Sequence, residues 1–413
     1  MTALVIAALC CGLASQQAAQ AASETIVAIQ IHGNTVTPDD EIRSMTGVAV
    51  GAPFEAGTAD AVAGRLKASK RFESVQVLKR YASISDMSQV ILVVIVDEGP
   101  VRIETTDDPD KPTRVVRSGR AHLMFLPVLN FEDGYGFTYG ARFALPEPLG
   151  KRSRVAFPLT WGGEKRAAAE LDKMFEHGPL TRVTAGGGVS QRTNPFYDQD
   201  DTRQRVWGRG EREFTRWLRA GATAGWQRVS FLNGVDEFAH GGADIVFDTR
   251  VDPILPRNAV YARAAYEHIA GANRSEFEGR GYVGLFGQTV FAVRAQSMNA
   301  DRALPPYLKP LLGGMNTLRG FAAGTDAGDA LAAASGELIV PLTSPLGVGK
   351  IGVSAFVDTA TVWDHGERLA DQPWKQGVGG SVWFSAAFIR ASVAVAHGIG
   401  ASTRVHFGAN VTF

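Results

Sequence analysis

The sequence predicts a membrane β-barrel of about sixteen antiparallel strands, preceded by one small α+β domain. Three observations lead to this fold class. Residues 119–413 read as a series of segments that alternate apolar and polar side chains, with turn residues between them. After the first apolar run, no stretch approaches the roughly 20 apolar residues that a membrane-spanning helix needs. Apolar residues make up 45% of the chain, yet its mean hydropathy is only −0.03, so they are dispersed rather than gathered into blocks.

Residues 1–21 read as a secretory signal peptide. The apolar run from Ala3 to Leu13 precedes Ala19-Gln20-Ala21, a small-residue cleavage site of the A-x-A type. A buried N-terminal helix is the alternative. Both cysteines, Cys10 and Cys11, fall in the apolar run, so a chain cleaved after it would contain no disulfide.

Residues 24–100 read as a small α+β domain with the element order β-α-α-β-β. Three segments alternate in period two and are expected to be strands: Thr25 to His32, Phe72 to Tyr81 and Gln89 to Val96. Thr37-Pro38-Asp39 predicts a helix start, with Thr37 as the N-cap and Pro38 at the first helical position. A second helix is expected from Ala56 to Ser69, where apolar residues recur at helical spacing.

A polar linker is expected at residues 101–118, and the barrel at residues 119–413. The last strand illustrates the alternation. Its two faces are Val405, Phe407, Ala409, Val411 and Phe413 on one side, and Arg404, His406, Gly408, Asn410 and Thr412 on the other. An apolar outer band beside a polar lumen is what a membrane barrel requires. A soluble β-sandwich would give the same alternation, but so many consecutive strands exceed the usual size of a sheet.

One connection is unusually long, with about thirty residues from Asn299 to Asp329 and no strand or helix pattern of its own. It contains Gly313-Gly314 and then Leu318-Arg319-Gly320-Phe321. We expect this loop to fold into the barrel lumen. Alternation places Glu337 and Asp358 on the lumenal face of neighbouring strands, and the planar guanidinium of Arg319 fits one or both of these carboxylates. A solvated loop arginine is the alternative.

The first strand is expected from Arg120 to Asn130, where it would pair with the last strand to close the barrel. Pro127 lies inside it and cannot donate a backbone hydrogen bond. We therefore expect few bonds across this junction, and a weak edge there could accept a client strand by β-augmentation.

The segment 24–100 resembles one polypeptide-transport-associated (POTRA) domain. The resemblance rests on the element order together with Gly33-Asn34, Gly51-x-x-Phe54, Arg71-Phe72-x-x-Val75 and a closing Val96-x-Glu98-Gly99. No single motif in this set is very specific, but the order as a whole is.

The barrel resembles that of the BamA/TamA superfamily of outer-membrane insertases and translocation pores, the bacterial surface antigen family. Its most specific element is Gly313-Gly314-x-x-x-Leu318-Arg319-Gly320-Phe321, which is similar to the family's (V/I)-R-G-(F/Y) loop motif between strands eleven and twelve. Leu318 departs from that motif, because the family has a β-branched residue there.

Two further motifs belong to the same resemblance. Asp248-Thr249-Arg250-Val251-Asp252-Pro253-x-x-Pro256 is similar to the family's periplasmic turn between strands eight and nine, with Asn258 where a Gly is usual. His406-x-Gly408-x-x-Val411-x-Phe413 is similar to the C-terminal β-signal by which an outer-membrane barrel is itself inserted.

The resemblance implies a barrel in the bacterial outer membrane with its POTRA domain in the periplasm. It implies a role in inserting or translocating unfolded outer-membrane or secreted proteins, with periplasmic or lipoprotein partners bound through the POTRA domain and no cofactor. A dedicated secretion pore for one partner and a passive channel or structural barrel are the alternatives.

Composition and motifs argue against other functions. The net charge is 0, with 42 basic and 42 acidic residues, which gives no support for a nucleic-acid partner. None of the eight histidines occurs in a His-Glu-x-x-His metal motif, and no Gly-x-Ser-x-Gly motif of a hydrolase is present. We therefore expect neither an enzyme nor a metal protein.

Overall fold

The computed structural model describes residues 24–83, 86–99, 101–104, 114–117, 123–251, 255–343, 349–386 and 389–411. The expected signal peptide lies outside the described residues. The chain divides into two compact units, one within residues 1–116 and the other within residues 117–413. No helix in the described ranges is long and apolar enough to cross a membrane.

The first unit has the expected order of elements. It comprises β1 (Thr25–His32), α2 (Asp39–Thr46), α3 (Thr58–Ala68), β2 (Ser74–Tyr81) and β3 (Gln89–Asp97). The sheet order is β1-β3-β2, with β1 parallel and β2 antiparallel to the central β3. Both helices and the sheet contribute fully buried side chains to its core, including Ile26, Ile42, Val62, Leu66 and Leu92.

The first helix begins differently from the prediction. Pro38 occupies the N-cap position and Thr37 does not cap the helix. Instead, the backbone N–H groups of Thr35, Val36 and Thr37 donate to the carboxylate of Glu98 at 2.6, 2.6 and 2.8 Å. Burial opposes ionisation of this carboxylate, but the hydrogen bonds from residues 35–37 outweigh it and lower the pKa of Glu98 to about 2. The charged side chain therefore ties the β1–α2 turn to the end of β3.

The segment expected to be a linker contains secondary structure. Two short strands, β4 (Val101–Glu104) and β5 (Arg114–Arg117), pair in a separate two-stranded sheet. Composition did not indicate this, because the polar run between them reads as linker.

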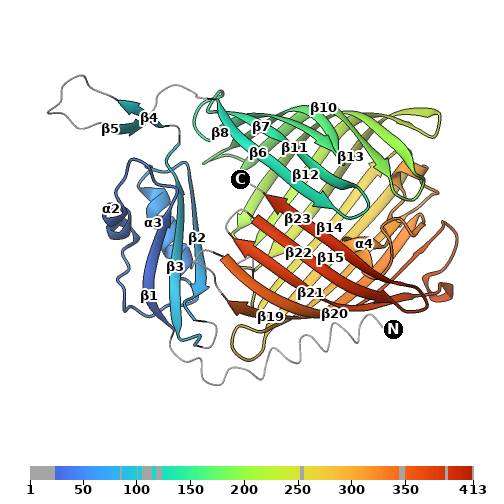
Figure 1. Ribbon diagram of the computed structural model, residues 1–413. Helices are drawn as coiled ribbons and strands as arrows, with labels where there is room; N and C mark the ends of the chain where they lie inside the picture. The colour runs from blue at the N-terminus through green and yellow to red at the C-terminus, as the bar shows by residue number, and fades with distance from the viewer. Residues whose placement is uncertain are drawn as a thin grey trace. The chain divides into compact units, whose positions relative to one another are not determined.

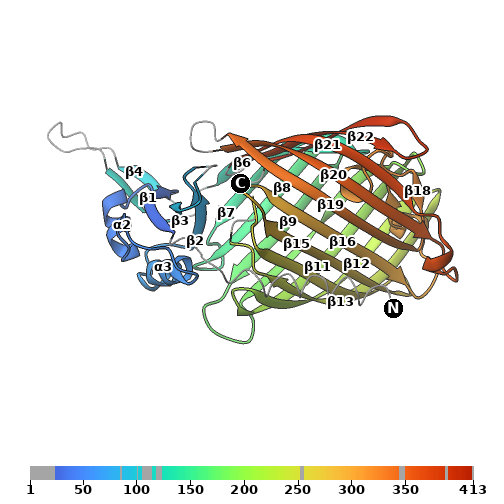
Figure 2. The ribbon, with the colours of Figure 1, turned by 90° about the horizontal axis from the view of Figure 1, so that it is seen from below.

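The second unit is a closed barrel of sixteen antiparallel strands, which confirms the predicted fold class. Figure 1 and Figure 2 show tilted strands around a lumen. The strands are β6 (Met124–Glu132), β7 (Gly136–Pro146), β8 (Ser153–Gly162), β9 (Lys165–Met174), β10 (Arg182–Asn194), β11 (Gln199–Thr215), β12 (Leu218–Phe231), β13 (Gly234–Asp248), β14 (Ala259–Ile269), β15 (Ala272–Gly284), β16 (Val290–Ala300), β19 (Ala330–Thr343), β20 (Gly349–Trp363), β21 (Lys375–Ala386), β22 (Ile389–Gly398) and β23 (Thr403–Val411).

The two faces of the strands differ as alternation predicts. On β23, Val405 and Phe407 are 52% and 48% exposed on the outer face, whereas His406 between them is 1% exposed. Part of the inner wall carries paired charges, such as Arg182 with Asp172. Another part, on β21 and β22, carries small residues, including Gly377, Gly379, Ala394, Ala396 and Gly398. This small-residue wall leaves room inside the barrel for a folded loop.

The loop between β16 and β19 occupies that room. It connects the eleventh and twelfth strands of the barrel, as expected. The expectation that it has no elements of its own is wrong. It contains a 3₁₀ turn, η1 (Pro306–Leu308), a strand pair, β17 (Leu311–Leu312) with β18 (Asp326–Ala327), and a short helix, α4 (Gly314–Thr317). Another 3₁₀ turn, η3 (Leu369–Asp371), lies between β20 and β21. We call residues 301–329 the lumenal loop; α4 lies inside the barrel (Figure 1).

The Glu98 bonds predict a pH dependence of the first unit. The pKa of Glu98 is lower in the folded unit than the ordinary value of 4.5, so its contribution to stability is complete above pH about 4.5 and is lost as pH falls to about 2. Glu98→Gln should remove this dependence and weaken the turn by about 1.5–3 kcal/mol.

The measurement is amide exchange of Thr35–Thr37 in the full chain, corrected for the intrinsic effect of pH on exchange. Glu55→Gln, which changes an exposed carboxylate of the same unit, is the control. Equal protection of these amides in Glu98→Gln and the unaltered chain would contradict the role given to Glu98.

Candidate functional site

Arg319, at the tip of the lumenal loop, is clamped to the barrel wall by Asp358 of β20. Its Nε and Nη2 atoms each donate to one carboxylate oxygen at 2.7 Å, and its backbone N–H donates to Oδ2 at 3.1 Å. Arg319 is 7% exposed and Asp358 only 1%. A bidentate arginine–carboxylate pair fixes the orientation of both planes. The loop tip therefore has one defined position on the wall.

The remaining guanidinium nitrogen positions are also used. Nη1 donates to Glu337 Oε2 at 3.0 Å, and Nη2 donates to Ser335 Oγ at 3.1 Å, both on β19. Ser335 in turn donates to Asp358 at 2.6 Å, and the Arg319 carbon Cζ lies 3.3 Å from the ring centroid of Phe356. We call Arg319 with these partners the Arg319 clamp. The structure thus brings Glu337 and Asp358, the two carboxylates named from alternation, to the same arginine.

Glycines allow the loop backbone to lie directly on the wall. Gly320 has a φ of +96°, and a Cβ there would come within 2.6 Å of the Gly398 nitrogen. A Cβ at Gly377 would come within 1.9 Å of the Arg319 carbonyl oxygen. Side chains at these positions would push the loop away. Gly377 and Gly398 were not named from the sequence, although small residues at alternate positions of two neighbouring strands were a usable signal.

Leu318 and Phe321 hold the tip from its apolar side. Leu318 is fully buried and packs with Leu312, Leu331 and Ala360. Phe321, 8% exposed, belongs to the same cluster. Leu318, the departure from the family motif, therefore fills a closed apolar site. The cluster anchors the loop on both sides of the charged Arg319.

His406 joins the loop tip to the last strand. The backbone N–H of Gly320 donates to His406 Nε2 at 2.9 Å, and His406 Nδ1 lies 2.5 Å from Asp133 Oδ2 in the β6–β7 turn. The sequence placed His406 on the lumenal face but assigned it to the β-signal. Asp133 was not named, because its meeting with His406 depends on how the barrel closes.

A second anchor holds the beginning of the lumenal loop. Tyr307 donates through its hydroxyl to Asp236 of β13 at 2.8 Å, and its carbonyl accepts from Arg203 of β11 at 2.8 Å. Leu304 and Leu308 pack beside it against Val229, Phe231 and Ile269. We call this set the Tyr307 anchor. The loop is thus attached both to β11–β14 and to β19, β20 and β23.

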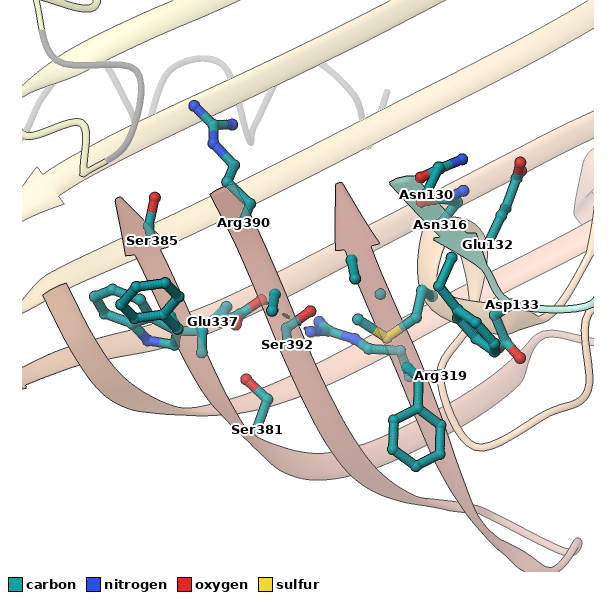
Figure 3. A pocket seen from close by; sticks show the side chains of 18 of the residues that line it. Asn130, Glu132, Asp133, Asn316, Arg319, Glu337, Ser381, Ser385, Arg390 and Ser392 are labelled. Carbon is teal, nitrogen blue, oxygen red and sulfur yellow. Dashed lines mark hydrogen bonds and ion pairs between the residues drawn. The ribbon is translucent and has the colours of Figure 1, made fainter. Parts of the chain in front are cut away.

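A cavity of about 650 Å³ adjoins the loop tip inside the barrel. Polar side chains from β6, β21 and β22 line it, among them Asn130, Glu132, Ser381, Ser392 and Arg390, and Asn316 and Arg319 contribute from the loop. Figure 3 shows Asn130, Glu132 and Asp133 on one side of this space and Ser385, Arg390 and Glu337 on the other. In the part of the chain that the structure describes, no group of His, Cys, Asp and Glu could hold a metal ion.

The junction between β23 and β6, which we call the seam, has few residue pairs among the described residues. Among the described residues, three pairs join the strands: Ala409 with Phe131, Asn410 with Asn130, and Val411 with Leu129. Nine pairs join β22 to β23 and nine join β6 to β7. Pro127 lies in β6 opposite Ala141 of β7. Thr403 to Gly408 of β23 have no strand partner in the described part of β6.

The motif between β13 and β14 folds into a compact turn at its described positions. Arg250 donates to both carboxylate oxygens of Asp248 at 2.9 and 2.8 Å, and Pro256 is buried. Asp252 and Pro253 lie outside the described residues. Asn258 has a φ of 48° and accepts the backbone N–H of Gly284 at 2.9 Å. Asparagine tolerates this left-handed conformation, which explains how it serves where the family usually has Gly.

The remaining residues of the C-terminal motif lie on β23. Gly408 faces Met315 of the lumenal loop, since a Cβ at Gly408 would lie 3.6 Å from the terminal methyl carbon of Met315. Val411 pairs with Leu129 at the seam. Phe413 lies outside the described residues. The described part of this motif therefore contacts both the loop and the first strand.

Comparisons with known proteins agree with this architecture. A model described as Omp85 superfamily domain matches residues 130–413, and a POTRA model, described as surface antigen variable number repeat, matches residues 24–99. These matches confirm the resemblance drawn from the motifs. No curated protein matches the chain.

Solved structures share the fold. BamA from Haemophilus ducreyi lacking POTRA domains 1–3 is similar at 15% identity and a TM-score of 0.62, over 94% of this chain and 84% of that chain. CdiB from Acinetobacter baumannii is similar at 11% identity and a TM-score of 0.50, over 95% of this chain and 74% of that chain.

Replacing Arg319 tests the clamp. Arg319→Ala leaves Asp358 buried without its cationic partner, which should destabilise the barrel by about 3–5 kcal/mol. The measurement is the urea concentration, or the temperature, at which the folded barrel loses its altered electrophoretic mobility. Arg205→Ala is the control, because Arg205 lies on the lumenal face and makes no ion pair with any described residue. Equal stability of the two variants would contradict a clamp.

Removing one hydroxyl tests the second anchor. Tyr307→Phe keeps the ring but leaves Asp236 without its donor, which should weaken loop docking by about 1–3 kcal/mol. Amide exchange of residues 304–309 should rise while that of residues 318–321 stays protected. Tyr266→Phe, at a tyrosine 58% exposed on the outer face, is the control. Unchanged exchange in Tyr307→Phe would show that apolar packing alone holds this end.

Proposed function

We propose that this chain, which belongs to the Omp85 superfamily and combines an outer-membrane barrel with a POTRA domain, inserts or translocates client proteins at the bacterial outer membrane. The observation that carries the proposal is the seam, which three residue pairs join among the described residues, beside a lumenal cavity lined in part by polar side chains. A strand edge in the bilayer has backbone donors and acceptors that lipid cannot satisfy. A client strand that pairs with this edge would satisfy them.

The client's own folding supplies the driving force. Within the described residues, three pairs join β23 to β6, so separating the strands breaks few of the described ladder bonds. Each backbone hydrogen bond that the client forms in the apolar bilayer satisfies one polar group of the client and one of the barrel edge. The cavity behind the seam gives the incoming polar face a hydrated space. The proposal needs neither a cofactor nor enzymatic chemistry.

The lumenal loop keeps the resting barrel closed. The Arg319 clamp fixes its tip to β19 and β20, while the Tyr307 anchor fixes its start to β11 and β13. Both attachments include directional bonds beside their apolar contacts, so the loop has discrete positions rather than a continuous range. Translocation through the lumen would require one attachment to release.

The POTRA domain receives partners in the periplasm. In its sheet, β3 is central and β2 is an edge strand. An edge strand can pair with an extended segment of an unfolded client or of a periplasmic or lipoprotein partner. This binding would raise the local concentration of the client near the barrel.

A dedicated secretion pore for one partner is the second candidate. The attachment of the loop to two separate parts of the wall, β13 and β20, favours it, because a loop released at one part could move within the lumen. Depleting the protein and surveying the outer-membrane proteome separates the candidates. Broad loss of barrel proteins supports an insertase, and loss of one secreted protein supports the dedicated pore. No loss, together with conductance in a planar bilayer, supports a passive channel.

Closing the seam by a disulfide tests the insertase directly. Phe131 and Ala409 are cross-strand partners, so cysteines at both positions should form a disulfide that joins the strands. We expect this variant, with Cys10 and Cys11 removed or replaced by Ser, to lose insertion of a barrel client into vesicles and to regain it after reduction.

The matched control is Ala222→Cys with Ala243→Cys, a cross-strand pair of β12 and β13 away from the seam. Its disulfide should leave insertion unchanged. Full insertion by the oxidised seam variant would rule out a seam route and favour passage through the lumen.

A further inference from the structure

His406 stands where the lumenal loop, the last strand and the first turn of the barrel meet. Its Nε2 accepts the Gly320 N–H at 2.9 Å, and its Nδ1 contacts Asp133 Oδ2 at 2.5 Å. An imidazole nitrogen that accepts a backbone N–H carries no proton, so the proton is on Nδ1 and is donated to Asp133. One ring nitrogen therefore accepts a hydrogen bond from the lumenal loop, and the other donates one to the β6–β7 turn.

The position of His406 on β23 is informative. The seam register pairs Ala409 with Phe131, and β6 ends at Glu132, one residue further. His406 thus lies on the part of β23 that runs past the end of β6. The residues around it have no strand partner in the described part of β6. Its side chain is nonetheless only 2% exposed. The lumenal loop, rather than a neighbouring strand, covers this stretch from inside.

Close backbone contacts extend the same junction. A Cβ at Gly314 would lie 3.2 Å from Asp133 Oδ2, and one at Gly134 would lie 2.4 Å from the Cβ of Ala323. The loop therefore touches the β6–β7 turn on both sides of its tip. It bridges β23 and this turn where the strand ladder does not.

We propose that His406 is a positioning residue that couples the Arg319 clamp to the closure of the seam, with Asp133 as its partner across the junction. Gly320 follows Arg319 directly, so the clamp aims the Gly320 N–H at His406. His406 in turn holds the β6–β7 turn beside β23. With the clamp formed, the seam is held shut from inside. With the clamp released, the seam is held by its strand ladder, which has three pairs among the described residues. This inference rests on the proposed function in taking the seam as the site of client entry.

Few residue types can make both of the hydrogen bonds that His406 makes. The side chain must offer an acceptor to the buried Gly320 N–H and a donor to the partly buried Asp133 carboxylate, and a residue that lacks either leaves that partner without its hydrogen bond. Phenylalanine keeps the ring and supplies neither. Glutamine supplies both, through its amide oxygen and nitrogen. His406→Phe should therefore lose both hydrogen bonds, and His406→Gln should restore them.

The test is amide exchange of residues 409–411 and 129–131 in the full-length barrel in lipid vesicles, without client. His406→Phe and Asp133→Ala should each speed this exchange about tenfold or more, the effect of losing one charge-assisted hydrogen bond. His406→Gln should recover most of the protection. Arg319→Ala should speed the same exchange, and adding His406→Phe to it should change little, because both act through one linkage.

His240 and Glu267 provide the matched control. They form a second lumenal histidine–carboxylate pair, with Nδ1 and Oε1 2.9 Å apart, on β13 and β14. His240→Phe should leave seam exchange unaltered. Faster seam exchange in both His→Phe variants would indicate general loosening and overturn the proposal. So would unaltered seam exchange in His406→Phe, or additive effects of His406→Phe and Arg319→Ala.

The outcome is separable from the proposed function. The exchange measurement needs no client and no activity. Fast seam exchange in His406→Phe combined with unaltered client insertion would refute the seam route but leave the coupling intact. Unaltered seam exchange combined with insertion that stops on disulfide closure of the seam would refute the coupling alone.

Discussion

The buried pair of Arg319 and Asp358 is the interaction on which the interior of the barrel depends. A guanidinium inside a barrel has a large desolvation cost, which only well-oriented acceptors can offset. Here one carboxylate accepts three bonds, a second carboxylate and a serine accept the rest, and an aromatic ring lies beside the guanidinium. Because all these partners lie on β19 and β20, the loop tip has one favourable place, and the positions of Gly320, Phe321 and α4 follow from it.

The wall around this pair is shaped to receive it. Gly377 and Gly398 are small because the loop backbone passes where their side chains would be. At the loop tip, β21 and β22 therefore contribute little side-chain volume, whereas strands elsewhere in the lumen carry paired charges such as Arg209 with Asp244. The lumen therefore has two kinds of wall, one packed against the loop tip and one that carries paired charges.

Much of the barrel could be predicted from the sequence, because the patterns that locate strands and their faces are local. Alternation over eight or more residues locates strands and faces, so the strand order, the position of the long loop and the lumenal placement of Glu337 and Asp358 could be predicted. The first helix start could not, because the bonds from Thr35, Val36 and Thr37 go to Glu98, about sixty positions away. The Tyr307 anchor depends on which walls the loop reaches. The meeting of His406 with Asp133 joins residues 273 positions apart and exists only once the barrel closes.

The two attachments of the lumenal loop involve barrel strands from different parts of the chain, so they can form at different stages of assembly. The barrel residues at the Tyr307 anchor, including Arg203, Val229, Asp236 and Ile269, all precede the loop in the chain. The residues that receive Arg319 and Gly320, from Ser335 to His406, all follow it. A barrel that forms from its N-terminal strands could seat the start of the loop early and its tip only last. The contact of His406 with Asp133 needs both the first hairpin and the final strand, so it can form only once both ends of the barrel are in place.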